Sequence, residues 1–125
     1  MTRVVIVDDH PVVREGLVAA LDVDVVGVFG SAEEALASGV KAEVIVLDLE
    51  LPGISGLDAI ARFDAPVLVL TAYATDEDID RALAAGAKGY LLKGAPLDDI
   101  ERAIAATCRT PRAPTPDNGA RRRRR

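Results

Sequence analysis

Short apolar runs alternate with amphipathic stretches along the first 107 residues of the chain. The apolar runs are rich in Val, Ile and Leu, and they are predicted as strands at Val4–Val7, Val25–Phe29, Val44–Leu47, Val67–Leu70 and Tyr90–Leu92. The stretches that follow place apolar residues at helical spacing, and they are predicted as helices at Val12–Leu21, Ala32–Ala37, Leu57–Phe63, Glu77–Ala85 and Leu97–Thr107. The pattern is therefore a succession of strand–helix units.

Residues with known helix-end preferences support two of these helices. Ser31 precedes the second helix as a predicted N-cap, with Glu34 at the capping-box position. Either Thr75 or Asp76 is expected to cap the fourth helix, and Gly86 is expected to end it. The helical assignments thus rest on end signals as well as on periodicity.

The strand runs are apolar throughout instead of alternating, which is typical of strands with helices on both faces. Strands that alternate with helices form a parallel sheet through right-handed crossovers. This favours an α/β, flavodoxin-like (βα)5 three-layer sandwich with strand order 2-1-3-4-5. A Rossmann half-domain has nearly the same periodicity, but no Gly-x-Gly-x-x-Gly follows the first strand.

The composition indicates the number of domains, the cellular location of the protein and the redox state of its compartment. A length of 125 residues, half of them apolar, suits one domain. Cys108 is the one cysteine, so an internal disulfide is excluded, which fits a reducing compartment. No apolar run approaches the ~18 residues of a membrane span, and no leader-like segment opens the chain. A cytoplasmic protein without membrane contact is therefore expected.

Residues 108–125 differ from the rest, since they contain prolines and a run of arginines, Arg121–Arg125, without apolar periodicity. We expect residues 1–107 to form the folded domain and residues 108–125 to form a disordered tail or a linker. The net charge of −5 becomes −10 for residues 1–120, which hold all 20 acidic residues and the 15 basic residues less the five terminal arginines. Such an acidic body is a poor surface for DNA, which would need the tail or a module outside this chain.

Polar residues follow the predicted strands at their carboxyl ends. Asp8 and Asp9 follow the first strand, Asp48 the third, Thr71 the fourth and Lys93 the fifth. Open parallel sheets bind ligands at this edge, and the first and third strands flank the switch point of the proposed order. Turns favour Asp and Thr in any protein, but so many polar residues at one edge favour a site over ordinary loop residues.

Three carboxylates in one crevice need a compensating charge. Two like charges ~4 Å apart repel by roughly 4 kcal/mol at an effective dielectric constant near 20, which is large beside the ~5–15 kcal/mol stability of a domain. Either one carboxyl keeps its proton or a cation binds, and oxygen ligands suit Mg²⁺, with Mn²⁺ as an alternative. A hard cation, a lysine, a hydroxyl and a nucleophilic Asp are parts for phosphoryl transfer.

Four motifs carry a family resemblance: VDDHPVVREGL, VLDLELPGISGLDAI, VLTAY and GAKGYLLK. Over residues 3–107 the chain resembles the receiver domain of bacterial two-component response regulators, most of all those of the NarL/FixJ/LuxR-type subfamily. The resemblance implies a domain that accepts a phosphoryl group from a sensor histidine kinase and then switches an interaction surface. Transcription would be controlled through a partner or through a DNA-binding module absent from this chain.

The resemblance also implies a role for each matching position. Asp48 would be the phosphoacceptor, and Asp9 and Asp48 would be carboxylate ligands of Mg²⁺. Asp8 would act through a water molecule, and the backbone carbonyl of Glu50 would complete the ligand set.

Further positions would respond to the phosphoryl group. Thr71 would hydrogen-bond it, Lys93 would pair with it, and Tyr90 would change rotamer together with Thr71. Glu50 and Tyr73 border, in the family, the path of the water that removes the phosphoryl group. A carboxylate and a bulky ring there imply a long-lived phosphorylated state.

The resemblance leaves the assembly and the output open. A homodimer through helices 1 and 5, or through the face of helix 4, strand 5 and helix 5, is expected, although the short first helix would alter such a surface. Gly94 stands where many receivers have Pro, which argues against a cis peptide there. No helix-turn-helix follows, so the chain is either a single-domain phosphorelay or adaptor receiver, or part of a transcription factor.

Two other classes fit part of the pattern. An aspartate-dependent Mg²⁺ phosphohydrolase uses a similar Asp, Thr and Lys set, but its Asp-x-Asp spacing is lacking in Asp8-Asp9-His10-Pro11. A flavodoxin-type cofactor binder would carry a Ser/Thr/Gly-rich phosphate loop at this place. His10 is interpreted as a turn residue, because no second metal-type ligand is expected to accompany it, and Cys108 as inert. The arginine run is either a solvated tail or a phosphate-binding arm.

Overall fold

The computed structural model describes residues 1–51, 56–72 and 75–109, in which strands and helices alternate strictly. The strands are β1 (Arg3–Val7), β2 (Asp24–Phe29), β3 (Val44–Leu47), β4 (Val67–Thr71) and β5 (Gly89–Leu92). The helices are α1 (Pro11–Ala20), α2 (Ala32–Ser38), α3 (Gly56–Ile60), α4 (Asp76–Ala84) and α5 (Leu97–Arg109). All predicted elements are present, and the largest difference is that α3 ends at Ile60 instead of Phe63.

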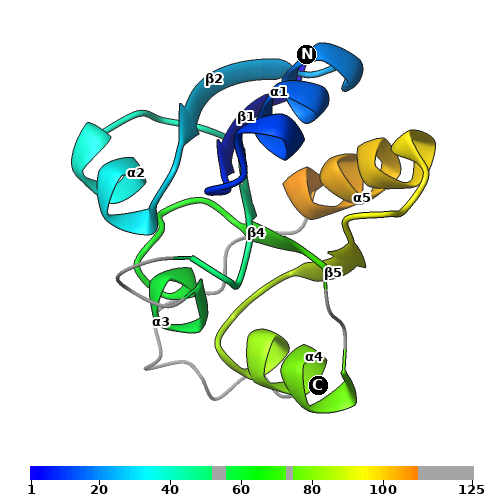
Figure 1. The fold of residues 1–125 in the computed structure, drawn as a ribbon. Coiled ribbons are helices and arrows are strands. Elements are labelled where there is room, and N and C mark those ends of the chain that lie inside the picture. The colour runs from blue at the N-terminus through cyan, green and yellow to red at the C-terminus, as the bar shows by residue number, and fades with distance from the viewer. Residues whose placement is uncertain (52–55, 73–74, 110–125) are drawn as a thin grey trace.

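All neighbouring strands of the sheet are parallel, and they lie in the order β2-β1-β3-β4-β5. The chain passes from β1 outward to β2 (Figure 1), and the strand order places the next strand, β3, on the other side of β1. The carboxyl ends of β1 and β3 therefore lie next to each other, with Val7 paired to Leu47. The predicted flavodoxin-like class and its strand order are confirmed.

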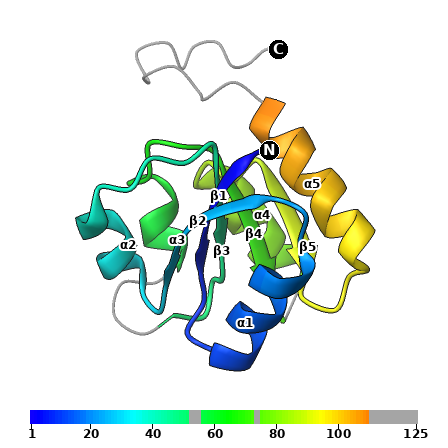
Figure 2. The same cartoon turned by 90° about the horizontal axis from the view of Figure 1, so that it is seen from above.

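Helices cover both faces of the sheet, which makes three layers (Figure 2). One core cluster joins Val4 and Ile6 of β1 to apolar residues of α1 and α5, and the other joins Val5 and Val7 to residues of α2, α3 and α4. Successive side chains of a strand point to opposite faces. Each residue of β1 therefore serves one of two cores, which explains why the strand runs are apolar throughout.

Side chains cap α2 and α4. The Ser31 hydroxyl accepts a hydrogen bond from the Glu34 amide (3.2 Å), while the Glu34 carboxylate accepts one from the Gly30 amide (3.3 Å). The return bond of the predicted capping box thus goes to the residue before the cap. The Thr75 hydroxyl accepts from the Asp78 amide (3.1 Å), which decides between the two predicted caps of α4 in favour of Thr75.

The carboxyl-terminal helix extends past its predicted end, because α5 includes Cys108 and Arg109. The remainder of the predicted tail and Tyr73 fall outside the described residues, so what was predicted for them stays a prediction. No peptide bond within the described ranges is cis, which agrees with the sequence argument at Gly94. None of the described helices has the length and apolar character needed to cross a membrane.

Candidate functional site

Backbone hydrogen bonds align the carboxyl ends of the strands. The Asp48 amide donates to the Val7 carbonyl (3.0 Å), one residue beyond the last pair of β1 and β3. The Lys93 amide donates to the Thr71 carbonyl (2.8 Å) beyond β5 in the same way. The residues that the sequence placed after the strands therefore meet at one edge of the sheet.

Lys93 joins two buried carboxylates at this edge. Its Nζ lies 2.8 Å from Oδ2 of Asp8 and 2.9 Å from Oδ2 of Asp48. The two carboxylate side chains are 4% and 0% exposed, and that of Lys93 is 14% exposed. Burial alone would lower the pKa of Lys93, but the hydrogen bonds to Asp8 and Asp48 outweigh it and hold the pKa above the ordinary 10.5. Lys93 is thus a fixed positive charge.

The second oxygen of each buried carboxylate accepts a backbone amide two residues further on. Oδ1 of Asp8 accepts from the His10 amide (2.8 Å), and Oδ1 of Asp48 accepts from the Glu50 amide (3.0 Å). Such turns are a local preference of Asp. They fix both carboxylates so that each turns its other oxygen toward Lys93.

His10 lies in the same cluster, together with the partly exposed Asp9. Its Nδ1 is 3.1 Å from Oδ1 of Asp8, 3.1 Å from Oδ1 of Asp9 and 3.9 Å from Oδ2 of Asp48. One ligand atom from each of these four residues lies within 4.8 Å of the others. The expectation that no metal-type ligand accompanies His10 is therefore wrong. Its position directly after two aspartates was a signal, which the turn interpretation set aside.

Thr71 and Tyr90 flank the site on β4 and β5. Thr71 is buried at the end of β4, and Tyr90 is half-buried against the core of the α2–α4 face. Burial raises the pKa of Tyr90, and the charges of Asp78 on α4 and of Glu50 after β3 raise it further. The phenol of Tyr90 therefore stays protonated, and its pKa depends on the charges of both flanking segments.

The charges and donors of the cluster suit a divalent cation. Three carboxylates and one ammonium leave a net charge of −2 when His10 is neutral. The carboxylate oxygens are hard ligands, which Mg²⁺ and similar ions prefer. Asp9 and Asp48 would hold such an ion, with Asp8 tied to Lys93 beside them.

Gly56 positions the segment that follows Asp48, and the sequence argument did not single it out. Its amide donates to the Leu49 carbonyl (3.3 Å) at the start of α3. A Cβ at this position would lie 2.5 Å from the Leu49 Cα and 2.8 Å from the Asp48 carbonyl oxygen. Both are backbone atoms, so only glycine permits this approach.

The close contact of Gly56 with the backbone of Asp48 and Leu49 can be tested by substitution. Gly56→Ala should lower the free energy of unfolding by about 1–3 kcal/mol, as overpacking does, because backbone beside Asp48 must move. Gly16→Ala is the matched control, since Gly16 is an exposed position inside α1 with nothing within 4 Å of the added atom. It should raise stability by about 0.5–1 kcal/mol. Urea unfolding followed by circular dichroism measures both, and equal shifts of one sign would contradict this account.

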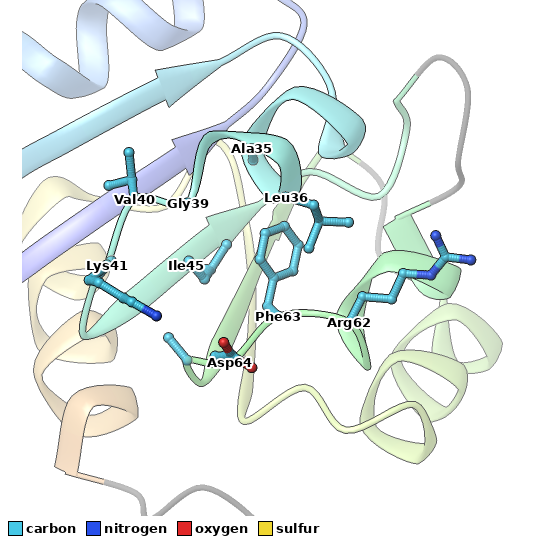
Figure 3. Close-up of a pocket in the computed structure, with 11 residues that line it drawn as sticks. Ala35, Leu36, Gly39, Val40, Lys41, Ile45, Arg62, Phe63 and Asp64 are labelled. Carbon is cyan, nitrogen blue, oxygen red and sulfur yellow. The ribbon is translucent and has the colours of Figure 1, made fainter.

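A pocket lies at the opposite edge of the sheet from the carboxylate cluster (Figure 3). Its lining comes from the end of α2, the loop before β3 and the loop before β4, at the amino ends of those strands. Phe63 and Ile45 form an apolar wall of this pocket, and Lys41 and Asp64 lie at its rim (Figure 3). Asp64 is the one acidic residue that lines this pocket, so the cluster of carboxylates among the described residues lies only at the edge formed by the carboxyl ends of the strands.

Comparison with known proteins agrees with the geometry. The family described as the response regulator receiver domain matches residues 4–105. The response regulator GacA of Pseudomonas protegens is 40% identical over 115 residues, which cover 83% of this chain and 54% of GacA. The DNA-binding transcriptional activator DevR/DosR of Mycobacterium tuberculosis is 41% identical over 115 residues, or 83% of this chain and 53% of that protein. The chain thus spans about half the length of these relatives.

Solved structures show the same fold. The signal receiver domain of the response regulator NarL from Mycobacterium tuberculosis superposes with a TM-score of 0.81 at 32% sequence identity, and the match covers 88% of this chain and 98% of that one. The family match over residues 4–105 includes all the residues of the cluster.

Proposed function

Because the chain belongs to the response regulator receiver domain family of two-component systems, we propose that Asp48 accepts a phosphoryl group from the phosphohistidine of a sensor kinase. The observation that carries this proposal is the bridge from Lys93 to the buried carboxylates of Asp8 and Asp48. A buried, oriented carboxylate beside a fixed ammonium is suited to attack phosphorus. No other cluster of carboxylates with ligand spacing occurs within residues 1–51, 56–72 and 75–109.

The transfer exchanges one bond to phosphorus for another. A carboxylate oxygen of Asp48 forms the new P–O bond while the P–N bond to the donor histidine breaks, and the imidazole leaves with the bonding electron pair. Lys93 neutralises the phosphoryl oxygens, since its pKa keeps it charged. A divalent cation, held by Asp9, Asp48 and the Glu50 carbonyl with Asp8 acting through water, would supply further neutralisation of that charge.

Phosphorylation of Asp48 would then change the packing of an interaction surface. The phosphoryl group adds about 1.5–2 negative charges and strong acceptors at the end of β3. We propose that the Thr71 hydroxyl turns toward it and that Tyr90 follows into the space left. The charges of Asp78 on α4 and of Glu50 beside the site both act on Tyr90, so this movement would bias two packings of the α4–β5–α5 face. The exposed Leu83 of α4 and Leu92 of β5 give that region apolar surface for a partner.

The partners follow from this role. A sensor histidine kinase supplies the phosphoryl group, and a homodimer through α1 and α5 or through the α4–β5–α5 face carries the signal. DNA would be bound through an output module outside this chain, which accords with the −10 charge of residues 1–120. The protein would work in the cytoplasm, as a phosphoacceptor and not as an enzyme with turnover.

One experiment separates this proposal from an aspartate-dependent phosphohydrolase. The full chain is incubated with Mg²⁺ and acetyl phosphate, while the mass of the protein and the release of inorganic phosphate are followed. A receiver should take up one phosphoryl group per chain and release phosphate slowly. Rapid release over many turnovers, with no trapped adduct, would favour the hydrolase.

The lifetime of the phosphorylated form tests the role proposed for Glu50 and Tyr73. We expect Glu50→Ala to shorten the lifetime roughly 2- to 10-fold, because the exposed carboxylate hinders the hydrolytic water. A tenfold change in this rate corresponds to about 1.4 kcal/mol in the activation free energy of hydrolysis. The pair Glu50→Ala/Tyr73→Ala should shorten it further. Glu15→Ala, an exposed substitution on α1, is the control. Phosphate release that is unchanged in the double variant would refute the role.

A further inference from the structure

We propose that Nδ1 of His10 is a ligand of the bound cation, so that this site prefers a transition-metal dication over Mg²⁺. The inference rests on the metal site of the proposed function and adds an imidazole nitrogen to its oxygen ligands. His10 is the one histidine of the chain, which makes the proposal open to an unambiguous test.

The distances around Nδ1 support coordination. Bonds of about 2.1 Å in an octahedral site separate adjacent ligand atoms by about 3.0 Å and opposite ones by about 4.2 Å. Nδ1 lies 3.1 Å from Oδ1 of Asp9, as adjacent ligands do, and 3.9 Å from Oδ2 of Asp48, between the two ideal values. The ring therefore lies within reach of a cation that both carboxylates would hold, since the ligand atoms of the cluster all lie within 4.8 Å of one another.

The position of the ring is set by the backbone. The His10 amide donates to Asp8, and His10 itself stands at the N-cap position of α1, where its side chain makes no capping bond. Contacts of Nδ1 hold the imidazole over the carboxylates, since this atom lies 3.1 Å from Oδ1 of Asp8 and 3.5 Å from Nζ of Lys93. In the neutral ring with its proton on Nε2, the lone pair of Nδ1 is available to a metal.

Ligand chemistry then determines the preference. Mg²⁺ and Mn²⁺ favour carboxylates, carbonyls and water, whereas imidazole suits Fe²⁺, Co²⁺, Ni²⁺ and Zn²⁺. Affinity for such nitrogen-containing sites rises from Mn²⁺ toward Cu²⁺. A site of oxygens alone follows the same order with a smaller rise, so His10 should widen the difference between the affinities for Co²⁺ and Mg²⁺.

The test uses Co²⁺ and Mg²⁺ with the untagged full chain. Calorimetry gives the affinity for Co²⁺, and competition gives that for Mg²⁺. His10→Asn should weaken Co²⁺ binding roughly 10-fold or more and leave Mg²⁺ binding within a factor of about two. Asp9→Asn is the matched comparison, and it should weaken both ions because it removes a shared oxygen ligand.

X-ray absorption at the Co edge provides the direct readout. The wild-type spectrum should contain imidazole scattering, which must come from His10, and His10→Asn should lose it. Co²⁺ that is displaced by Mg²⁺ but shows no imidazole scattering would overturn the ligand role of His10 and leave the proposed function intact. If neither ion binds, or if Asp9→Asn changes nothing, the metal site of the proposed function fails as well.

Discussion

Asp48→Asn should abolish stable phosphoryl labelling by acetyl phosphate, from one group per chain to none. The amide keeps the shape of the side chain and one oxygen that can accept the Glu50 amide, but it cannot form an acyl phosphate. Lys93 keeps Asp8 as a partner, so the fold should persist. Intact-protein mass spectrometry measures the label, and circular dichroism checks the fold.

An exposed aspartate provides the control for this loss. Asp22→Asn changes one carboxylate of the α1–β2 connection, where the backbone amide and not the side chain bonds to Glu101. It should label like the wild type. Labelling that persists in Asp48→Asn, or that falls equally in Asp22→Asn, would exclude Asp48 as the acceptor.

Lys93→Met should have the largest effect on stability. The substitution leaves Asp8 and Asp48 buried beside each other without their cation. Removing one member of a buried ion pair costs about 3–5 kcal/mol, and the partial exposure of Lys93 places this case near 3 kcal/mol. Because Mg²⁺ replaces the missing charge, its addition should restore stability more in the variant than in the wild type. Urea unfolding with chelator and with Mg²⁺ gives both values.

The stability lost in Lys93→Met should depend on pH in a defined direction. The pKa of Lys93 is raised in the folded state, so its stabilisation is fully present below the ordinary 10.5 and is lost as the pH rises through the higher folded value. The difference between wild type and Lys93→Met should thus be constant from neutral pH to about 10.5. Lys41→Met, at an exposed lysine before β3, is the control. A loss as small as that of Lys41→Met would show that the bridge does not stabilise the fold.

The sequence predicted the fold well because two kinds of signal agreed. Apolar runs such as Val44–Leu47 are buried on both faces, and end residues such as Ser31 and Thr75 act locally. The end of α3 was predicted three residues late, since Phe63 continues the helical periodicity but packs into the core from the following loop. Periodicity reports burial, and it does not distinguish a helix from the turn after it.

The site was predicted only in part. Asp8, Asp48 and Lys93 were found because strand ends are visible in sequence, and the parallel order brings those ends together. The environment of His10 depends on how the β1–α1 loop turns its ring over the aspartates, which spacing does not encode. Gly56 depends on an approach between backbone segments, and such contacts also leave no periodic signal.

The most direct test of the account is the chemical identification of the phosphorylated residue. The chain is labelled with acetyl phosphate and Mg²⁺ and then reduced with borohydride, which cleaves an acyl phosphate, releases phosphate and converts the aspartate to homoserine. Peptide mapping should find homoserine at position 48 in the labelled protein and at no position in the unlabelled one. Homoserine at Asp8 or Asp9, or a label that resists borohydride, would contradict the assignment of Asp48 as the phosphoacceptor.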